Sequence, residues 1–320
     1  MNNTKFYICP MSKNIVDVIL EINSPFIGLL PSRRQVEFNG GYVNNWNTQS
    51  FSEYVKNINP VISIERDHGG IGQNDTDEYK SYSEDANYFD LVHIDPWKYF
   101  KVFEEGLNET IENIIFLTKL NSNIKIEVGT EETIRKFTTE EVDKLLNELK
   151  SKLTESQFSQ ISHVCIQSGV GLDLINQKNT GSFDIERLKS MVSICKKYNK
   201  LSKEHNGDYL SDNEIKVRFQ TGLDSLNIGP EIAQLETNTY LSHMNENEIN
   251  KFYDVCLNSK KWVKWVSNDF DVTNKERLIM ICGHYNFMDL QNILGTNENI
   301  NLLAKQKIKN RIEELLLCLK

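Results

Sequence analysis

The chain has 320 residues, of which 39% are hydrophobic and 25% are charged, a composition typical of a folded globular protein rather than a disordered one. Its net charge of −9 argues against the broad basic face that a nucleic acid or an anionic membrane surface would require. No apolar run approaches the roughly 18 residues that a bilayer-spanning helix needs. The six cysteines show neither a CxxC motif nor a regular spacing, so we expect reduced thiols in a cytoplasmic protein.

Eight short β-rich runs alternate along the chain with stretches of helical spacing, such as Ile15, Val18, Ile19 and Ile22. Strict alternation of strand and helix predicts parallel strands with helical crossovers, and eight such units close into a (β/α)8 TIM barrel. An open doubly wound sheet remains the alternative, although no GxGxxG motif follows the first run. The runs comprise residues 5–10, 25–30, 61–65, 90–95, 124–129, 163–169, 200–205 and 224–229. The seventh run carries the weakest strand signal because it is short and polar.

Strand signals stop near residue 235, and the remaining sequence has the pattern of helices. It carries Trp262, Trp265 and Phe270 and ends in an amphipathic run, IKNRIEELLLCLK. We therefore expect a barrel over residues 1–235 and a helical C-terminal extension over residues 236–320, packed on the barrel or used between subunits.

The active site of such a barrel lies at the carboxyl ends of its strands, and polar residues follow most of the predicted strands. Arg34, Glu131 and Ser168 stand at such ends. We predict substrate-binding roles for a larger set that shares this position: Arg33, Gln35, Asp95, Gln167, Asn206, Asp208, Asn227 and Gly229.

His68 follows the third run and His205 ends the seventh, on roughly opposite sides of the predicted ring. If both imidazoles point inward, they could hold a divalent metal that polarises a substrate carbonyl. Asp67 precedes His68 and cannot share its direction along a regular strand, but at a strand end it could turn toward the substrate as a proton acceptor. The alternative for His68 is a plain turn residue before Gly69 and Gly70.

The other histidines carry weaker signals. His93 lies inside the run LVHIDPW, where a hydrogen-bonded core histidine and a site group are equally consistent with the sequence. We expect a structural role for His163 at a strand start. His243 and His284 lie in the helical region without the spacing of metal ligands.

Seven motifs, taken in order, resemble the so-called non-catalytic subunits of class II tagatose-bisphosphate aldolase and, more distantly, the class II fructose- and tagatose-bisphosphate aldolases. Each motif is weak alone, but all seven keep the order and the strand-end positions of the family. They are QVEFNGGY (35–42), RDHGG (66–70), VHIDPW (92–97), VGTEE (128–132), CIQSGVG (165–171), EHNGDY (204–209) and LNIGPEIAQLE (226–236).

The resemblance implies a TIM barrel in which Asp67 is the base and His68 and His205 are metal ligands, with Zn²⁺ as the expected ion. It also implies that the LNIGPE segment binds a substrate phosphate through backbone N–H groups. The expected substrate is a sugar phosphate or a related small carbohydrate, and the expected partners are further copies of the chain or a catalytic aldolase subunit.

Three departures from the active aldolases stand out. The third ligand histidine, in an Ala-His-Gly motif after the sixth strand, is replaced by 169–171, which read Gly-Val-Gly. Pro230 stands where a threonine is usual in the phosphate loop, and it has no N–H to donate. The Gly-Gly-Ser-Gly phosphate turn is replaced by 206–208, which read Asn-Gly-Asp.

Because the third histidine is missing, Glu127, Glu131, Asp95 and a water molecule are the candidates to complete the metal shell, and we include Glu127 among the predicted ligands. Two functions follow from these residues. One is metal-assisted reversible C–C cleavage, or epimerisation, of a ketose phosphate. The other is a catalytically silent subunit that binds and stabilises a catalytic partner.

Overall fold

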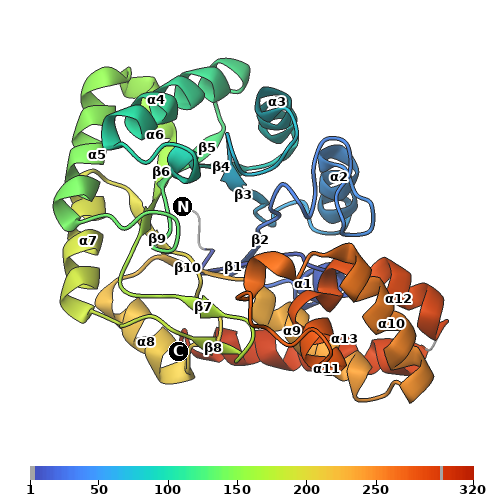
Figure 1. Cartoon of the computed structure of the whole chain (residues 1–320). Coiled ribbons are helices and arrows are strands. Elements are labelled where there is room, and N and C mark those ends of the chain that lie inside the picture. The colour runs from blue at the N-terminus through green and yellow to red at the C-terminus, as the bar shows by residue number, and fades with distance from the viewer. Residues whose placement is uncertain (1–3, 296–297) are drawn as a thin grey trace.

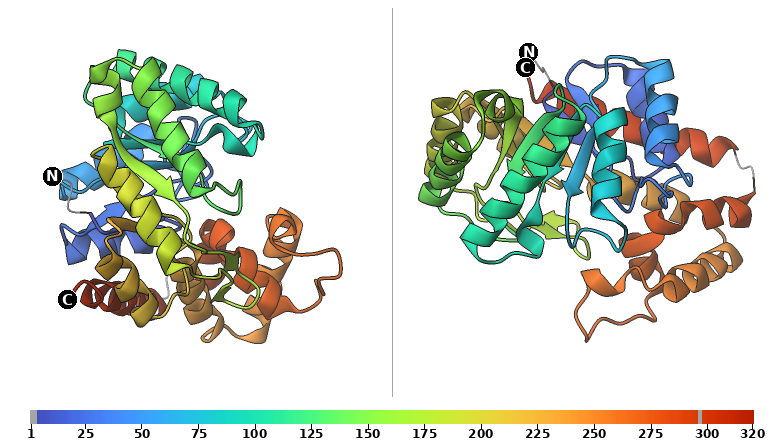
Figure 2. Two further views of the ribbon diagram at one scale, coloured as in Figure 1. Left: turned by 90° about the vertical axis from the view of Figure 1, so that its left-hand side faces the viewer. Right: turned by 90° about the horizontal axis from the view of Figure 1, so that it is seen from above.

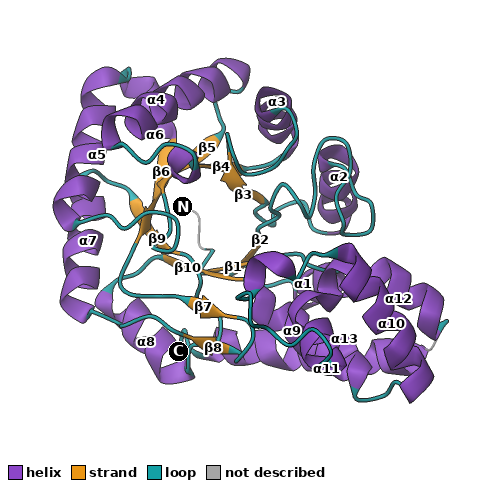
Figure 3. Cartoon of the chain, in the orientation of Figure 1, coloured by secondary structure: helices purple, strands orange, loops and turns teal. Residues whose placement is uncertain are grey.

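The computed structural model describes residues 4–295 and 298–320. Its centre is a ring of eight parallel strands surrounded by helices (Figures 1 and 3). The neighbours around the ring follow the order β2-β1-β10-β9-β6-β5-β4-β3. The strands are β1 (Phe6–Ile8), β2 (Ile27–Leu29), β3 (Glu65–Gly69), β4 (Leu91–Ile94), β5 (Lys125–Gly129), β6 (Ile161–Ile166), β9 (Leu201–Glu204) and β10 (Ser225–Ile228).

This architecture confirms the predicted barrel and removes the open doubly wound alternative. Each of the eight β-rich runs overlaps one strand of the ring. The polar seventh run overlaps β9. The loop after β6 contains a short antiparallel pair that was not predicted, β7 (Leu172–Asp173) with β8 (Lys178–Asn179).

The third strand begins later than predicted. Val61 is 87% exposed in a turn after Pro60, and β3 starts at Glu65 where the predicted strand ends. As a result, Asp67 and His68 lie within β3 rather than after it.

The ring is weakest between β2 and β3. Only two isolated bridges join these strands, Leu29 with Ile64 and Ser32 with Asp67. The buried Arg66 guanidinium reinforces this seam, because it donates to the carbonyl oxygens of the chain after β2 and pairs with Asp85 of α3.

Helices cover the outside of the ring, and several begin at side-chain caps that the sequence provides. The side chains of Ser12, Asn47 and Ser211, for example, accept from backbone N–H groups in the first helical turns. The helices up to β10 are α1 (Lys13–Ile22), α2 (Thr48–Ile58), α3 (Glu78–Tyr88), η1 (Pro96–Lys98), α4 (Phe103–Leu120), α5 (Thr139–Lys152), α6 (Glu155–Gln160), α7 (Ile185–Lys197) and α8 (Asp212–Thr221).

The C-terminal part is helical, as expected, and lies beside the barrel in all views (Figures 1 and 2). It comprises α9 (Pro230–Leu241), α10 (Glu246–Ser259), η2 (Val263–Trp265), α11 (Lys275–Cys282), η3 (Gly283–Asn286), α12 (Phe287–Leu294) and α13 (Glu298–Leu317).

The C-terminal helices contribute side chains to two separate apolar cores. Ile308, Ile312 and Leu315 of α13 join the core of the barrel, whereas Phe252 of α10 and Leu278 of α11 belong to a second, smaller core. The extension therefore packs on the barrel through its last helix. The division into 1–235 and 236–320 remains a prediction; residue 235 lies inside α9.

All six cysteines are buried and none forms a disulfide bond: Cys9, Cys165, Cys195, Cys256, Cys282 and Cys318. Over residues 4–295 and 298–320, no helix combines the length and the apolar character that crossing a bilayer demands.

Candidate metal centre

A cavity of about 230 Å³ opens at the carboxyl ends of the strands, where the sequence placed the site. The barrel contributes Asp67, His68 and His205 to its wall. The helical extension contributes Lys264, Trp265 and Tyr285, which the sequence did not connect with the site.

An irregularity in β3 turns two successive side chains toward this cavity. The register between β3 and β4 shifts between Arg66 and Gly69, and His68 has a φ of 44° in the left-handed region. A regular strand would point Asp67 and His68 to opposite faces, but this bulge lets both line the cavity. Gly69 and Gly70 follow it, and Gly70 also has a positive φ, which glycine adopts without strain.

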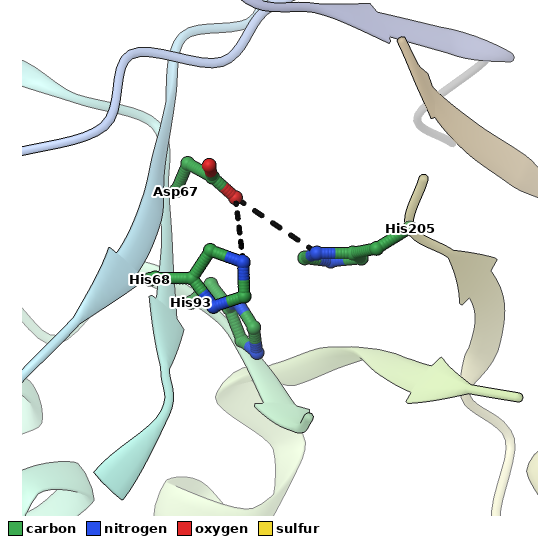
Figure 4. Close-up of side chains that lie close together, drawn as sticks. All are labelled: Asp67, His68, His93 and His205. Atoms are coloured by element: carbon green, nitrogen blue, oxygen red, sulfur yellow. Dashed lines mark ion pairs between the residues drawn. The ribbon is translucent and has the colours of Figure 1, made fainter. Parts of the chain in front are cut away.

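Three imidazoles and one carboxylate meet at this point (Figure 4). Ring centroids lie 5.1 Å apart for His68 and His205, 4.8 Å for His93 and His205, and 5.0 Å for His68 and His93. Asp67 Oδ1 lies 3.6 Å from His68 Nε2 and 3.9 Å from His205 Nδ1. One ligand atom from each of these four residues lies within 4.8 Å of those of the other three, a spacing suited to holding one ion.

Each imidazole is held by an acceptor at its outer nitrogen. His68 Nδ1 lies 2.6 Å from Asp95 Oδ2, and His205 Nε2 lies 2.9 Å from Glu127 Oε1. His93 Nε2 lies 3.1 Å from the carbonyl oxygen of Gly129. Metal-binding histidines commonly donate their second N–H to such a carboxylate or carbonyl, which fixes the tautomer and leaves the other nitrogen free for the ion.

The nitrogens left over are His68 Nε2, His205 Nδ1 and His93 Nδ1. The buried His93 Nδ1 has no hydrogen-bond partner, and neither has the buried Asp67 Oδ1. Buried polar atoms are rarely left unsatisfied, so these two atoms indicate that something binds between them.

The charges around the imidazoles favour a cation. Burial alone would lower the pKa of His68, but Asp67, Asp95 and Glu131 outweigh it and raise the pKa to about 10, so a metal ion at Nε2 would have to replace the proton that this ring carries there at pH 7. Burial lowers the pKa of His93 to about 4, so this ring is neutral at pH 7, the form that binds metals.

A cluster of buried charged side chains lies next to the imidazoles, inside the barrel. Glu127 Oε2 lies 2.9 Å from the ammonium of Lys203, which also pairs with Glu65. Burial alone would raise the pKa of Glu127, but Lys203, His93 and His205 hold it well below its usual range. Since both of its oxygens face cations or imidazoles, Glu127 is placed to orient His205.

Two residues predicted to bind substrate, Arg33 in the cavity wall and the buried Gln167, form hydrogen bonds within the protein. The Arg33 guanidinium pairs with Glu37 at 2.7 Å and donates to the carbonyl oxygens of Gly70 and Thr76. Gln167 is buried outside the cavity wall, and its amide group donates to the carbonyl oxygens of Thr130 and Arg135.

Other predicted residues line the cavity. They are Gln35, Asn206, Asp208, Asn227 and Gly229. Asn227 is the strongest candidate for binding a ligand, because the residue is only 4% exposed and neither its side-chain nitrogen nor its side-chain oxygen has a hydrogen-bond partner. An amide in this state suits a ligand with hydroxyl groups.

The implied phosphate position at the start of α9 is filled by the chain itself. Asp208 Oδ1 accepts from the N–H groups of Gly229 at 2.9 Å and Glu231 at 2.8 Å, while Pro230 has no N–H. The N–H of Ile232 donates to the carbonyl oxygen of Gly229. In this structure a side-chain carboxyl group therefore occupies the backbone donors that LNIGPE was expected to offer to a substrate phosphate.

His93 is the residue whose role the sequence left undecided. Its position in β4 places it next to His68 of β3, since β3 and β4 are neighbours in the ring. The available signal was the sequence His93-Ile94-Asp95, with a histidine two residues before a strand-end carboxylate and hence on the same face of the strand.

Comparison with known proteins gives structural matches only. No protein-family model matches the chain, and neither does any curated protein. A solved protein of Sinorhizobium meliloti 1021, described as a probable tagatose 6 phosphate kinase, aligns with 98% of this chain and 100% of its own, with 14% identity and a TM-score of 0.73. This chain has the same fold.

Two further structures share the fold. The fructuronate-tagaturonate epimerase UxaE from Cohnella laeviribosi aligns over 99% of this chain and 81% of its own, with 9% identity and a TM-score of 0.64. The fructose-bisphosphate aldolase of Campylobacter jejuni aligns over 98% of this chain and 90% of its own, with 13% identity and a TM-score of 0.57. Since the alignments take in nearly the whole chain, the likeness extends to the C-terminal helices.

Proposed function

We propose that the protein is a metal-dependent, aldolase-like enzyme of carbohydrate metabolism that cleaves or epimerises a small ketose phosphate. The observation that carries this proposal is the group of three imidazoles around Asp67, each held at its outer nitrogen by an acceptor. A barrel that served only as a scaffold would have no physical reason to bury these groups with free inner nitrogens.

The residues assigned to the ion are His68, His93 and His205, and Zn²⁺ is the expected metal because imidazole nitrogens suit it. His93 then takes the place of the histidine that the aldolases carry after their sixth strand. Glu127, Asp95 and the Gly129 carbonyl act as the outer partners that orient the rings, so Glu127 is a positioning residue rather than a ligand.

A divalent metal bound there would act as a Lewis acid on the carbonyl group of the ketose. Asp67 faces the same space and would take the proton from the hydroxyl group beside the bond that breaks, and return it in the reverse direction. Asn227, with its free amide, would bind a hydroxyl group of the sugar. Epimerisation needs the same metal and proton acceptor, so the site serves either reaction.

The test measures the metal content of the purified full-length protein, followed by a retro-aldol assay on ketose phosphates with and without added divalent ions. His93→Gln and His205→Ala should each lose metal and activity while keeping the circular dichroism spectrum of the wild type. Asp67→Asn should keep the metal and lose activity. Full metal content in His93→Gln would contradict the assignment of the third ligand.

The rival function is a silent subunit. The carboxyl group of Asp208 at the start of α9 supports it, since the phosphate position implied by the family is filled. A protein without activity on any ketose or ketose phosphate that assembles tightly with an aldolase would establish the rival and overturn the enzyme proposal.

A further inference from the structure

The cavity that contains the metal centre has a second chemical feature. Three cations line it from three parts of the chain: Arg34 from the loop after β2, Lys98 from η1 after β4, and Lys264 from η2 in the helical extension. Within the described part of the chain, none of their charged groups forms an ion pair or a hydrogen bond, so all three charges are available to a ligand.

The three cations lie close enough to repel one another. Desolvation and the charges of Arg34 and Lys98 lower the pKa of Lys264 to about 7, and desolvation together with Arg34 lowers the pKa of Lys98. Asp75 and Asp95 favour the charged form of Lys98 but do not contact it. All three residues are exposed, so water solvates part of their charge, and an anion bound among them would relieve the mutual repulsion that these pKa shifts reflect.

Neighbouring residues influence the position of these cations and the charge around them. Lys264 lies over the ring of Trp265, with Nζ 4.2 Å from the ring centroid, so its position is partly fixed by the extension. Arg34 and Lys264 also border an adjoining groove lined by Lys260 and Lys261 and by one carboxylate, Asp75, so the charged residues of this groove are mainly positive. Arg33, the neighbour of Arg34, is committed to Glu37 and adds nothing to this region.

We propose that Arg34, Lys98 and Lys264 form the binding subsite for the phosphate group of the substrate, in place of the start of α9. This proposal rests on the proposed function, because it assumes that the carbonyl end of the same substrate lies at the histidines. In this proposal the carboxyl group of Asp208 keeps the phosphate away from the start of α9, and Arg34, Lys98 and Lys264 bind the phosphate within the cavity. A phosphate dianion matches several converging cations, whereas one bidentate arginine would satisfy a carboxylate.

The proposal gives the helical extension a part in the site. Lys264 and Trp265 belong to η2, far from the barrel in sequence, yet they line the same cavity as His205. A barrel without this extension would lack one side of the phosphate subsite.

The test titrates inorganic phosphate into the full-length protein by calorimetry, with the wild type compared with Arg34→Gln, Lys98→Met and Lys264→Met. Each substitution should weaken phosphate binding about tenfold, as expected for the loss of one charge-assisted contact. The matched control is Lys119→Met, an exposed lysine in the last turn of α4 near the opposite end of the barrel, which should bind phosphate as the wild type does.

Two further arms separate this proposal from the proposed function. His205→Ala should retain phosphate binding, because the subsite does not depend on the metal, and it should lose activity. Acetate should bind at least tenfold more weakly than phosphate to the wild type; equal or tighter binding of acetate would instead indicate a carboxylate subsite and overturn the proposal.

Binding of phosphate that is unchanged in all three cation variants, or absent from the wild type, would also overturn it. Those outcomes would leave the metal assignment standing, since an active enzyme could still act on an uncharged ketose. Loss of activity in His205→Ala with phosphate binding intact supports both proposals.

Discussion

Replacing Asp85 by asparagine should destabilise the protein through the seam between β2 and β3. Arg66 and Asp85 are both fully buried, and their two contacts measure 2.8 Å and 2.7 Å. Because arginine stays charged, Asp85→Asn leaves a buried guanidinium without its partner, a change that typically costs about 3–5 kcal/mol. Asparagine keeps one acceptor oxygen and Glu37 lies nearby, so we expect the lower end, about 3 kcal/mol.

Urea unfolding followed by circular dichroism measures this loss, and thermal unfolding should show a midpoint lower by about 5–10 °C. The control is Glu104→Gln, which breaks an exposed pair with Lys144 and should leave both curves unchanged. A loss below about 1 kcal/mol in Asp85→Asn would refute the view that this pair secures the seam. The double variant Arg66→Met with Asp85→Leu should recover part of the loss, because it removes both buried charges.

Three other outcomes are expected. Lys203→Met should lower stability by about 3–5 kcal/mol in urea unfolding, because it leaves Glu127 as a buried carboxylate without its cation; a neutral effect would contradict this. Stability should fall as pH decreases below about 6.5, because burial, Lys264 and Lys261 lower the pKa of His284 to about 3 in the folded state, and the unfolded chain therefore binds the extra proton. This histidine contributes up to about 1.4 kcal/mol per pH unit between those two pKa values, so His284→Phe should give a shallower dependence of the urea midpoint on pH, and an unchanged slope would argue against it. Asn227→Leu should raise the KM for a ketose phosphate with little loss of metal, as measured by steady-state kinetics and metal analysis, whereas an unchanged KM would exclude Asn227 from substrate binding.

The order of strands and helices could be predicted from the sequence because it depends on local patterns. Each β-rich run is followed by turn residues and by a helix with apolar spacing, and caps such as Ser12 and Asn47 mark where helices begin. Eight repeats of that pattern favour a closed ring, and the ring in turn places strand-end residues such as Asp67 and His205 at one face.

The full set of residues in the metal centre could not be predicted from the sequence. It depends on which strands become neighbours in the ring and on the bulge in β3. His93 joins the site since β4 lies next to β3, and Asp67 shares the cavity with His68 only because the register of β3 shifts. Likewise, Gln167 and Arg33 stand at strand ends, but their side chains donate hydrogen bonds to loop carbonyl groups that lie far away along the chain.

By itself the sequence determined the fold class, the cluster at the strand ends and the helical character of the last 85 or so residues, because periodicity and capping act over a few neighbouring residues. Only the tertiary structure decided which charged groups are paired within the protein and which line the cavity without a partner. Asp208 fills the start of α9 and Lys264 reaches the cavity from the extension, since both contacts join segments whose approach is set by packing of the whole molecule.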